Sequence, residues 1–262
     1  VVIGLDYGHE NIKIGLSLLG KGVHVALNQQ NKRLSPSYFA IWNTTNPNQT
    51  QRSKHLSISE VRSISWDYNE RAYSHFLKYP QNAFKGLKNI ADNYNGLTRR
   101  EASAILLRHL FSTMDNSQHL PNSVYVVFAI DPDYPCINRY MLHEIIKMSG
   151  AHLKSIIDAP SAVANLYALE KSQLYNKSPK TVVFFDVGAE KSWMSVFSFK
   201  KTPSNPIVKQ LSLISNIPIS GSMIDERLAD YFIQLFSKEN NFDFQLPLKA
   251  RLAFVDSARR IK

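Results

Sequence analysis

The chain has 262 residues, 44% of them hydrophobic, which is enough to bury a core in one large domain or in two lobes. Its single cysteine, Cys136, excludes an internal disulfide and a metal cluster built on cysteines. The net charge of +10 is scattered rather than gathered in a basic stripe with aromatics, so we expect no nucleic-acid partner, and no apolar run approaches the roughly 18 residues of a membrane span.

The chain opens with two predicted strands joined by a short polar turn. The first apolar run ends in Asp6-Tyr7-Gly8, and a second extends from Ile12 to Leu18. A turn glycine lets an anion approach the backbone, successive N–H groups can bind it, and an aspartate at a strand end can hold the waters of Mg²⁺. Asp-x-Gly also occurs by chance in many turns, so on this stretch alone an ordinary hairpin turn is favoured and the anion site stays the alternative.

The next elements of the first half are less uniform. Residues 22–27 and 37–42 are predicted strands, residues 43–51 a polar surface loop, and residues 57–95 are ambiguous, with helical stretches near 68–79 and 83–90. A capping box at Thr98 and Glu101 then predicts a helix. Its apolar face is made of Ile105, Leu106, Leu110, Phe111 and Met114.

Alternating strands and helices follow. Residues 124–130 and 153–157 are predicted strands, and residues 137–148 a helix that stops at Gly150. A second helix covers residues 160–169 with Pro160 in its first turn, and residues 171–180 form a polar connector.

The opening pattern then returns. A strand beginning at Thr181 ends in Asp186-Val187-Gly188, and apolar strands follow at 193–199 and 208–214. Ser220-Gly221-Ser222 enters a helix with the apolar stripe Ile224, Leu228, Phe232 and Leu235, and its N-terminus is an expected anion site. A duplicated strand–turn–strand unit predicts two phosphate-binding turns facing one cleft.

These motifs together resemble the nucleotide-binding domain of the heat-shock protein 70 family over essentially the whole chain. Asp6-Tyr7-Gly8 and Asp186-Val187-Gly188 are similar to its two phosphate loops, and Ser220 to Asp225 to its Gly-Gly-x-Asp-Phe-Asp segment. Tyr79-Pro80-Gln81-Asn82 with Lys88 resembles its Asn-Pro-x-Asn segment and catalytic lysine. Ile157-Asp158-Ala159-Pro160-Ser161 resembles Ile-Asn-Glu-Pro-Thr, and Arg260-Ile261-Lys262 the start of its adenosine-contacting helix.

The resemblance implies an α/β fold of the actin/hexokinase/heat-shock-protein-70 ATPase type, with two lobes that are each built on a mixed sheet. Residues 1–170 would form lobe I, with a helical insertion at about 57–115, and residues 171–262 an incomplete lobe II. Because the chain starts inside a strand and stops inside a helical pattern, we expect it to be a piece of a longer protein.

The resemblance also implies ATP/ADP and Mg²⁺ as cofactors. Lys88 and Asp186 are the candidate catalytic residues, and Asp6 and Asp186 would hold Mg²⁺ through water. The candidate nucleotide-binding residues are Asp6, Gly8, His9, Glu10, Asp186, Gly188, Ala189, Gly221, Ser222, Arg259 and Lys262. Lys88 is also compatible with a solvated helix lysine, and a turn histidine such as His9 is more often incidental than catalytic.

Two departures from the family pattern indicate how this chain would treat ATP. His9-Glu10 stands where the family has two threonines, and Asp6, Gly8, Glu10 and Lys13 resemble the large endoplasmic-reticulum branch, the 170-kDa glucose-regulated protein and its fungal counterpart. Ala159 stands where the family has a glutamate that supports hydrolysis. Because phosphoryl transfer depends on positioning, we expect nucleotide binding with weak ATP hydrolysis or none.

In that branch the protein resembles a nucleotide exchange factor for the main lumenal heat-shock protein 70, which would also hold unfolded polypeptides through a region past Lys262. The expected location is the endoplasmic reticulum lumen, with the cytoplasm as alternative. Sequons at Asn43, Asn48 and Asn176 fit a lumenal protein but are about as frequent as chance predicts. A chaperone that itself hydrolyses ATP is the alternative function, and a small-metabolite kinase on the same fold is a third.

Overall fold

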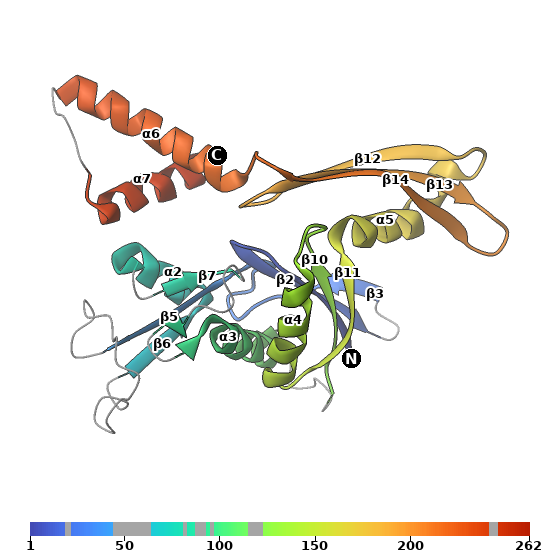
Figure 1. Ribbon diagram of the computed structural model, residues 1–262, viewed down its shortest axis with the longest axis horizontal. Coiled ribbons are helices and arrows are strands. Elements are labelled where there is room, and N and C mark those ends of the chain that lie inside the picture. The colour runs from blue at the N-terminus through green and yellow to red at the C-terminus, as the bar shows by residue number, and fades with distance from the viewer. Residues whose placement is uncertain are drawn as a thin grey trace.

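The computed structural model describes residues 1–18, 22–43, 64–80, 83–86, 93–94, 97–114, 123–240 and 246–262. Helices and strands alternate along the chain and gather into two halves, each with its own sheet (Figure 1). The described strands are β1 (Val2–Tyr7), β2 (Asn11–Leu18), β3 (Gly22–Val25), β4 (Ser35–Pro36), β5 (Tyr38–Asn43), β6 (Ile64–Tyr68), β7 (Ala83–Lys85), β8 (Asn93–Tyr94), β9 (Leu97–Thr98), β10 (Tyr125–Ile130), β11 (His152–Asp158), β12 (Lys180–Val187), β13 (Ser192–Lys201) and β14 (Pro206–Ile217). The described helices are α2 (Asn69–Lys78), α3 (Arg99–Thr113), α4 (Cys136–Met148), α5 (Ala159–Glu170), the 3-10 turn η3 (Ser172–Tyr175), α6 (Gly221–Asn240) and α7 (Leu248–Ile261).

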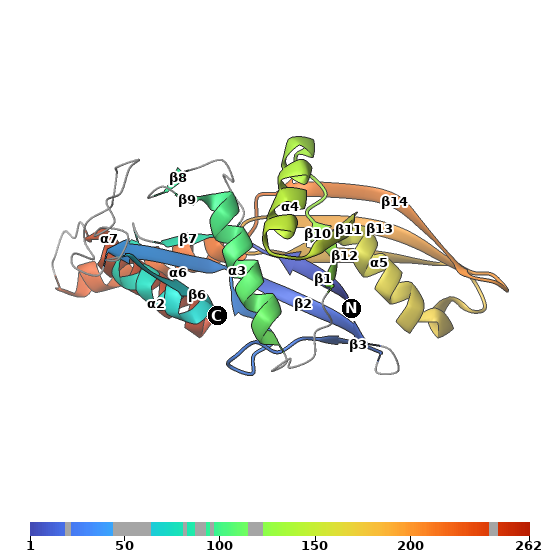
Figure 2. The same cartoon turned by 90° about the horizontal axis from the view of Figure 1, so that it is seen from below.

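The first half is organised on a mixed sheet in the order β11-β10-β1-β2-β3. β1 pairs antiparallel with β2 and parallel with β10, so the opening hairpin is confirmed and lies at the centre of the sheet. Alternate residues of these strands, such as Ile3 and Leu5, are buried against Leu107 and Ile145 of the helices α3 and α4. Both helices cross the same face of the sheet (Figure 2).

The capping box predicted for α3 is confirmed. The Thr98 side chain accepts a hydrogen bond from the Glu101 N–H at 3.2 Å, and the Glu101 carboxylate accepts one from the Thr98 N–H at 2.7 Å. Leu106, Leu110, Phe111 and Met114 are buried, as their spacing predicts. Local hydrogen bonds and a buried stripe agree here, which is why this helix was readable from sequence alone.

One predicted helix is wrong in its described part. Residues 83–85 of the expected helix 83–90 form β7, which pairs antiparallel with β5 through Tyr38↔Lys85 and Ala40↔Ala83. Pairing with a buried strand outweighs helix propensity in so short a segment. Residues 87–90 lie outside the described residues, as do Lys88, the residues Gln81 and Asn82 of the catalytic-lysine segment, and the sequon at Asn48.

The second half is built on the antiparallel sheet β12-β13-β14. Helix α5 covers one face of it, where Ala164, Ala168 and Tyr175 pack against Phe197 and Phe199. Helix α5 lies within residues 1–170, which were predicted to form lobe I, but its buried side contributes to the core of the second half. Helices α6 and α7 pack on each other, and α7 also reaches α2 of the first half (Figure 1). Among the described helices we find none that is both long and apolar enough to cross a membrane.

Candidate functional site

The two Asp-x-Gly turns have the same backbone geometry. Gly8 N–H donates to the carbonyl of Asn11 at 3.0 Å, and Gly188 N–H donates to the carbonyl of Lys191 at 3.1 Å. A Cβ on Gly8 would lie 2.7 Å from the Asn11 oxygen, and one on Gly188 would lie 2.6 Å from the Lys191 oxygen. Both positions therefore require glycine for the same steric reason, and the structure shows that the repeat read from the sequence is a repeat of conformation.

The second turn is fastened to the start of α6. Gly221 N–H donates to the Gly188 carbonyl at 2.8 Å, and Ser222 N–H to the Ala189 carbonyl at 2.9 Å. The next two amides, of Met223 and Ile224, donate to Ser220. All four N-terminal amides of α6 are thus used within the protein, so a ligand anion at this helix would feel its dipole rather than bind free N–H groups.

A cavity of about 510 Å³ lies where the two halves meet, within the range of small-molecule sites. The first half contributes Glu10, Asn11, Pro36, Tyr38 and Tyr73, and the second contributes Val187, Gly188, Ala189, Gly221, Ser222, Asp225, Asp256, Arg259, Arg260 and Lys262. Seven of the predicted binding residues line this cavity: Glu10, Gly188, Ala189, Gly221, Ser222, Arg259 and Lys262. Asp6, Gly8, His9 and Asp186 belong to the two turns beside the cavity and do not line it.

Glu10 lies at the cavity wall, at the centre of an ion-pair network. Its carboxylate accepts from Lys85 Nζ at 2.5 Å, from Arg259 at 3.3 Å and from the Tyr38 hydroxyl at 3.2 Å. Arg259 comes from α7, so one carboxylate of the first turn binds cations from both halves. Burial alone would lower the pKa of Arg259, but Glu10 and the neighbouring Tyr73 and Tyr38 raise it, so the guanidinium stays charged.

A second carboxylate, Asp225 of α6, holds α7 in place. Asp225 of α6 is buried and pairs with Lys262 Nζ at 2.6 Å and with Arg259 at 3.4 Å. Lys262 also donates to the Gly221 carbonyl at 3.1 Å, which ties the end of α7 to the second turn. Arg259 in addition donates to the Tyr73 hydroxyl of α2 at 3.1 Å. Arg259 and Lys262 are thus placed by carboxylates, with their remaining donors available at the cavity wall.

One polar atom at the cavity wall has no partner among the described residues. The Ser222 hydroxyl oxygen is buried and forms no hydrogen bond there, although the residue lines the cavity. A buried hydroxyl without a partner costs stability unless a ligand supplies the hydrogen bond. Together with the cations of α7, this hydroxyl fits a polar, anionic ligand such as a nucleotide.

The two turn aspartates lie in one electrostatic environment. Burial raises the pKa of Asp186, the charge of Asp6 raises it further, and Lys13 opposes both. Asp6 accepts a hydrogen bond from Lys13 Nζ at 3.0 Å. Burial also raises the pKa of Asp131, which follows β10, although the charge of Lys191 opposes the shift. No group of three or more His, Cys, Asp or Glu side chains arranged for a metal occurs in the described part of the chain. Two carboxylates that repel each other fit a hydrated Mg²⁺, which keeps most of its waters, better than a dedicated metal cage.

Further ion pairs cross between the halves beside the cavity. His9 Nδ1 lies 3.2 Å from the Glu190 carboxylate, which joins the two turns directly. Lys191 binds Asp133 at 2.6 Å and Asp131 at 3.4 Å. Tyr73 of α2 donates to Asp256 of α7. His9 therefore joins the two turns through Glu190.

Several residues that line the cavity or lie beside it were not predicted from the sequence. Lys85 is the described lysine that reaches Glu10, whereas the predicted Lys88 lies outside the described residues. Tyr73 and Asp256 were missed because no local motif marks side chains whose partners lie more than 180 positions away, and Tyr38 was missed because it meets Glu10 from 28 positions away. At the start of α5, Asp158 caps the helix by accepting from Ser161 N–H at 2.8 Å, and Ala159 follows it with no polar group.

The arrangement can bind a phosphate-bearing ligand between two glycine turns, with cations from α7 and a free hydroxyl on α6. The family model described as Hsp70 protein matches residues 2–262 of this chain. That match spans both turns, both sheets and the cavity between them, and it confirms the predicted fold class. The chain therefore belongs to the Hsp70 family of ATP-binding chaperones.

Proposed function

We propose that this chain is an ATP-binding domain that acts as a nucleotide exchange factor for the main Hsp70 chaperone of the endoplasmic reticulum lumen, and that it belongs to the large lumenal branch of the family. In this proposal the longer protein also binds unfolded polypeptides through a region beyond Lys262. Domains of the Hsp70 family bind ATP and ADP, generally with Mg²⁺, and work with unfolded chains and partner chaperones. The exchange role and the lumenal location go beyond the family and are the parts that need testing.

The observation that carries the proposal is the position of Glu10. A carboxylate in the first turn neutralises Arg259, which lines the cavity, and Lys85, which lies beside it. Charge stabilisation of a transferring phosphoryl group needs cations that are free to follow it. Lys85 and Arg259 are instead paired with Glu10, and the pair with Arg259 joins the two halves, which favours a domain in which ATP stabilises the closed conformation and is not rapidly hydrolysed.

The described residues suggest how nucleotide would favour the closed domain. Gly188, Ala189 and Ser222 come from the second half and Glu10 and Tyr38 from the first, so a ligand in this cavity contacts both. A ligand shifts a conformational equilibrium by its differential affinity for the two states. Asp6 and Asp186 would hold a hydrated Mg²⁺, which would supply charge neutralisation for the phosphates. The closed domain would then present a fixed surface to its partner and accelerate release of the partner's ADP.

The test is ADP release from a lumenal Hsp70 loaded with fluorescent ADP, with and without the full-length protein and ATP. We expect release to accelerate about tenfold or more, the scale of ordinary coupling between sites. A phosphate-release assay on the full-length protein alone decides against the alternative function. Turnover at the rate of an active chaperone ATPase, or no effect on the partner's ADP release, would sink the exchange-factor proposal.

A variant at Glu10 tests the observation itself. Glu10→Gln keeps the shape of the side chain but frees Lys85 and Arg259 from its charge, so we expect ATP affinity to rise about tenfold, the effect of about 1.4 kcal/mol. Glu239→Gln on exposed α6 is the matched control and should leave the affinity unchanged. The measurement is a titration with a fluorescent ATP analogue, and a lower affinity in Glu10→Gln contradicts the assignment.

A further inference from the structure

The two Asp-x-Gly turns carry a glutamate at the same place in the repeat. Glu10 follows Gly8 by two positions and Glu190 follows Gly188 by two positions, so the glutamates are 180 positions apart, as the glycines are. The two turns also share their backbone hydrogen bond, from the glycine N–H to the carbonyl three residues later. The two carboxylates are therefore equivalent in conformation as well as in sequence.

Each of these glutamates pairs with a cation from the opposite half. Glu10 of the first turn accepts from Arg259 of α7 at 3.3 Å. Glu190 of the second turn lies 3.2 Å from Nδ1 of His9 in the first turn. The repeat thus supplies two carboxylates that reach across in opposite directions, and together they tie the halves at two points.

The imidazole of His9 is held in position by its surroundings. The Ser37 hydroxyl donates to the His9 carbonyl at 2.6 Å. Gly86 follows β7 with a φ of +63°, and a Cβ on it would lie 2.8 Å from Nδ1 of His9, so the end of β7 packs closely on the ring. The His9 side chain is 18% exposed and that of Glu190 is 34% exposed, which leaves the pair partly shielded from water.

The two cross-half contacts differ in how their cations titrate. The guanidinium of Arg259 stays charged at every ordinary pH, whereas a histidine changes its charge near pH 6.5. A carboxylate at hydrogen-bond distance favours the imidazolium form. The other charged groups of the turns and of the segments next to them are Asp6 with Lys13, Glu10 with Lys85 and Arg259, Lys191 with Asp131 and Asp133, and Arg99, which donates to the Lys85 carbonyl.

We infer that the repeated glutamates form a charge latch with a permanent contact, Glu10 with Arg259, and a pH-dependent contact, Glu190 with His9, so that the two halves close more tightly when His9 is protonated. Closing then takes up a proton, and this contribution is lost as pH rises through the titration of His9 in the closed domain. A ligand in the cavity contacts both halves, so a proton on His9 and a bound ligand favour the same closed state. The latch acts within the protein alone and does not depend on exchange activity.

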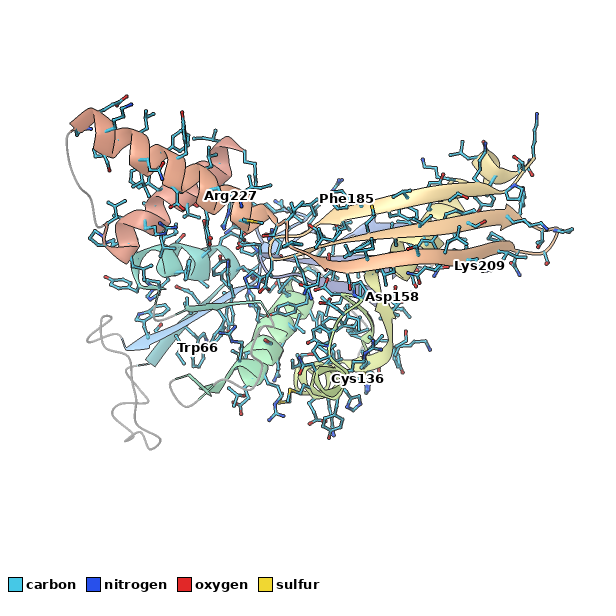
Figure 3. The ribbon with its side chains drawn as sticks, turned by 45° about the horizontal axis from the view of Figure 1, so that its top comes forward. Trp66, Cys136, Asp158, Phe185, Lys209 and Arg227 are labelled. Carbon is cyan, nitrogen blue, oxygen red and sulfur yellow. The ribbon has the colours of Figure 1, made fainter. Side chains whose placement is uncertain are left out.

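The test measures the distance between the halves in the nucleotide-free full chain. One spin label is attached to the native Cys136 of α4 and the other to the Arg227→Cys variant of α6, since both positions are exposed. Figure 3 shows these two residues well apart, one on each half. We expect double electron–electron resonance to give a closed-to-open ratio that rises about tenfold from about pH 8 to about pH 5, the effect of a preference of one pKa unit.

Variants of the latch separate charge from shape. His9→Gln and Glu190→Gln should both hold the ratio at its high-pH value throughout, because the pair of opposite charges is gone. His9→Lys, whose charge is permanent, should hold it at the low-pH value. His143→Gln is the matched control, because His143 lies 3.5 Å from Glu144 of the same helix and this pair does not join the halves. It should titrate as wild type does.

Three outcomes would overturn the inference. A wild-type ratio that does not change with pH would show that His9 has no part in closing. A pH response that persists in His9→Gln would assign the effect to other groups, such as His75 and His109, whose pKa values are lowered by burial. A His9→Lys variant that stays at the high-pH ratio would show that charge is not the cause. Because no partner protein enters the measurement, these outcomes are independent of the exchange-factor proposal.

Discussion

Gly188 has no room for a side chain, because a Cβ would meet the Lys191 carbonyl oxygen at 2.6 Å. We expect Gly188→Ala to push the second turn out of position and to lower ATP affinity by about tenfold or more, at a cost of about 1–3 kcal/mol in unfolding free energy. Calorimetric titration with ATP and urea unfolding measure the two effects.

Gly4 provides the matched control for that substitution. A Cβ there would meet nothing within 4 Å, and the residue lies in β1 only two positions before Asp6. Gly4→Ala should leave ATP affinity unchanged and keep or slightly raise stability, because alanine restricts the unfolded chain. Similar losses in the two variants would show that the effect at Gly188 is not steric.

Asp186 gives the protein a pH dependence with a defined sign. Burial, reinforced by Asp6, raises its folded-state pKa above 3.8. A group with a raised folded pKa stabilises the fold fully below its unfolded pKa, and that contribution is lost as pH rises through the folded pKa. Asp186→Asn should therefore be more stable than wild type at neutral pH, and the difference should vanish toward about pH 4.

Urea unfolding of both proteins across this pH range checks the sign. A variant that is less stable than wild type at neutral pH would mean that the attraction of Lys13 for Asp186 outweighs the cost of burial.

The site residues differ in how well they could be predicted from the sequence. Asp6 and Asp186 could be found because each sits in a local turn pattern, whereas Lys85 could not, since its role depends on β7 pairing with β5.

At the scale of elements, the packing of α5 on the second sheet is the contact to test. Phe199 of β13 is completely buried among Tyr167, Tyr175, Phe184 and Phe197. Phe199→Ala should destabilise the chain by about 3–5 kcal/mol, through lost transfer free energy and the cavity it leaves. Phe185→Ala, on the opposite face of the same sheet and 56% exposed, should cost less than about 1 kcal/mol.

Both values come from chemical unfolding of the 262-residue chain, monitored by circular dichroism. Equal losses in the two variants would mean that α5 does not cover the face that carries Phe199.

The elements that could be predicted well are those whose signals are local, such as the Thr98 capping box and the apolar stripe of α3. The segment 83–90 was misread because β7 is defined by the strand it pairs with, and three residues carry too little pattern to indicate that partner.

At the scale of the whole molecule, Arg259 joins the two halves. It reaches Glu10 in the first half, Tyr73 in α2 and Asp225 in α6. Arg259→Met keeps the bulk of the side chain but leaves Glu10 and buried Asp225 with one cation each. We expect ATP affinity to fall about tenfold or more and the amides of α7 to exchange faster, because the variant removes a cation that lines the cavity and breaks the pairs that join α7 to Glu10 and Asp225.

Arg251→Met is the matched control on the same helix. Arg251 pairs with Asp230 at 2.7 Å, both side chains are half-exposed, and the pair joins α6 to α7 without touching the first half. Its loss should cost less than about 1 kcal/mol and leave ATP affinity unchanged. If both variants lose affinity equally, α7 acts through its own stability rather than through the contact with Glu10.

The duplication of the chain was visible in the sequence, because each half repeats a strand, an Asp-x-Gly turn and a strand with 180 positions between them. The way in which the halves close on each other was not. That arrangement depends on pairs such as Tyr73 with Asp256 and His9 with Glu190, whose members belong to different halves and carry no shared local pattern. Composition and spacing therefore predict the two repeated strand–turn–strand units. How the two halves close on each other depends on polar contacts between residues far apart in the sequence.

The second turn is hydrogen-bonded to the start of the long helix α6, so a movement of the turn would be passed to the helix. The Gly188 and Ala189 carbonyls hold the first two amides of α6, and Lys262 returns from α7 to the Gly221 carbonyl, so turn, α6 and α7 move as one body. Helix α6 has 20 residues and is roughly 30 Å long at about 1.5 Å per residue. A tilt of a few degrees at Gly188 would therefore be magnified into a larger displacement at the far end of α6.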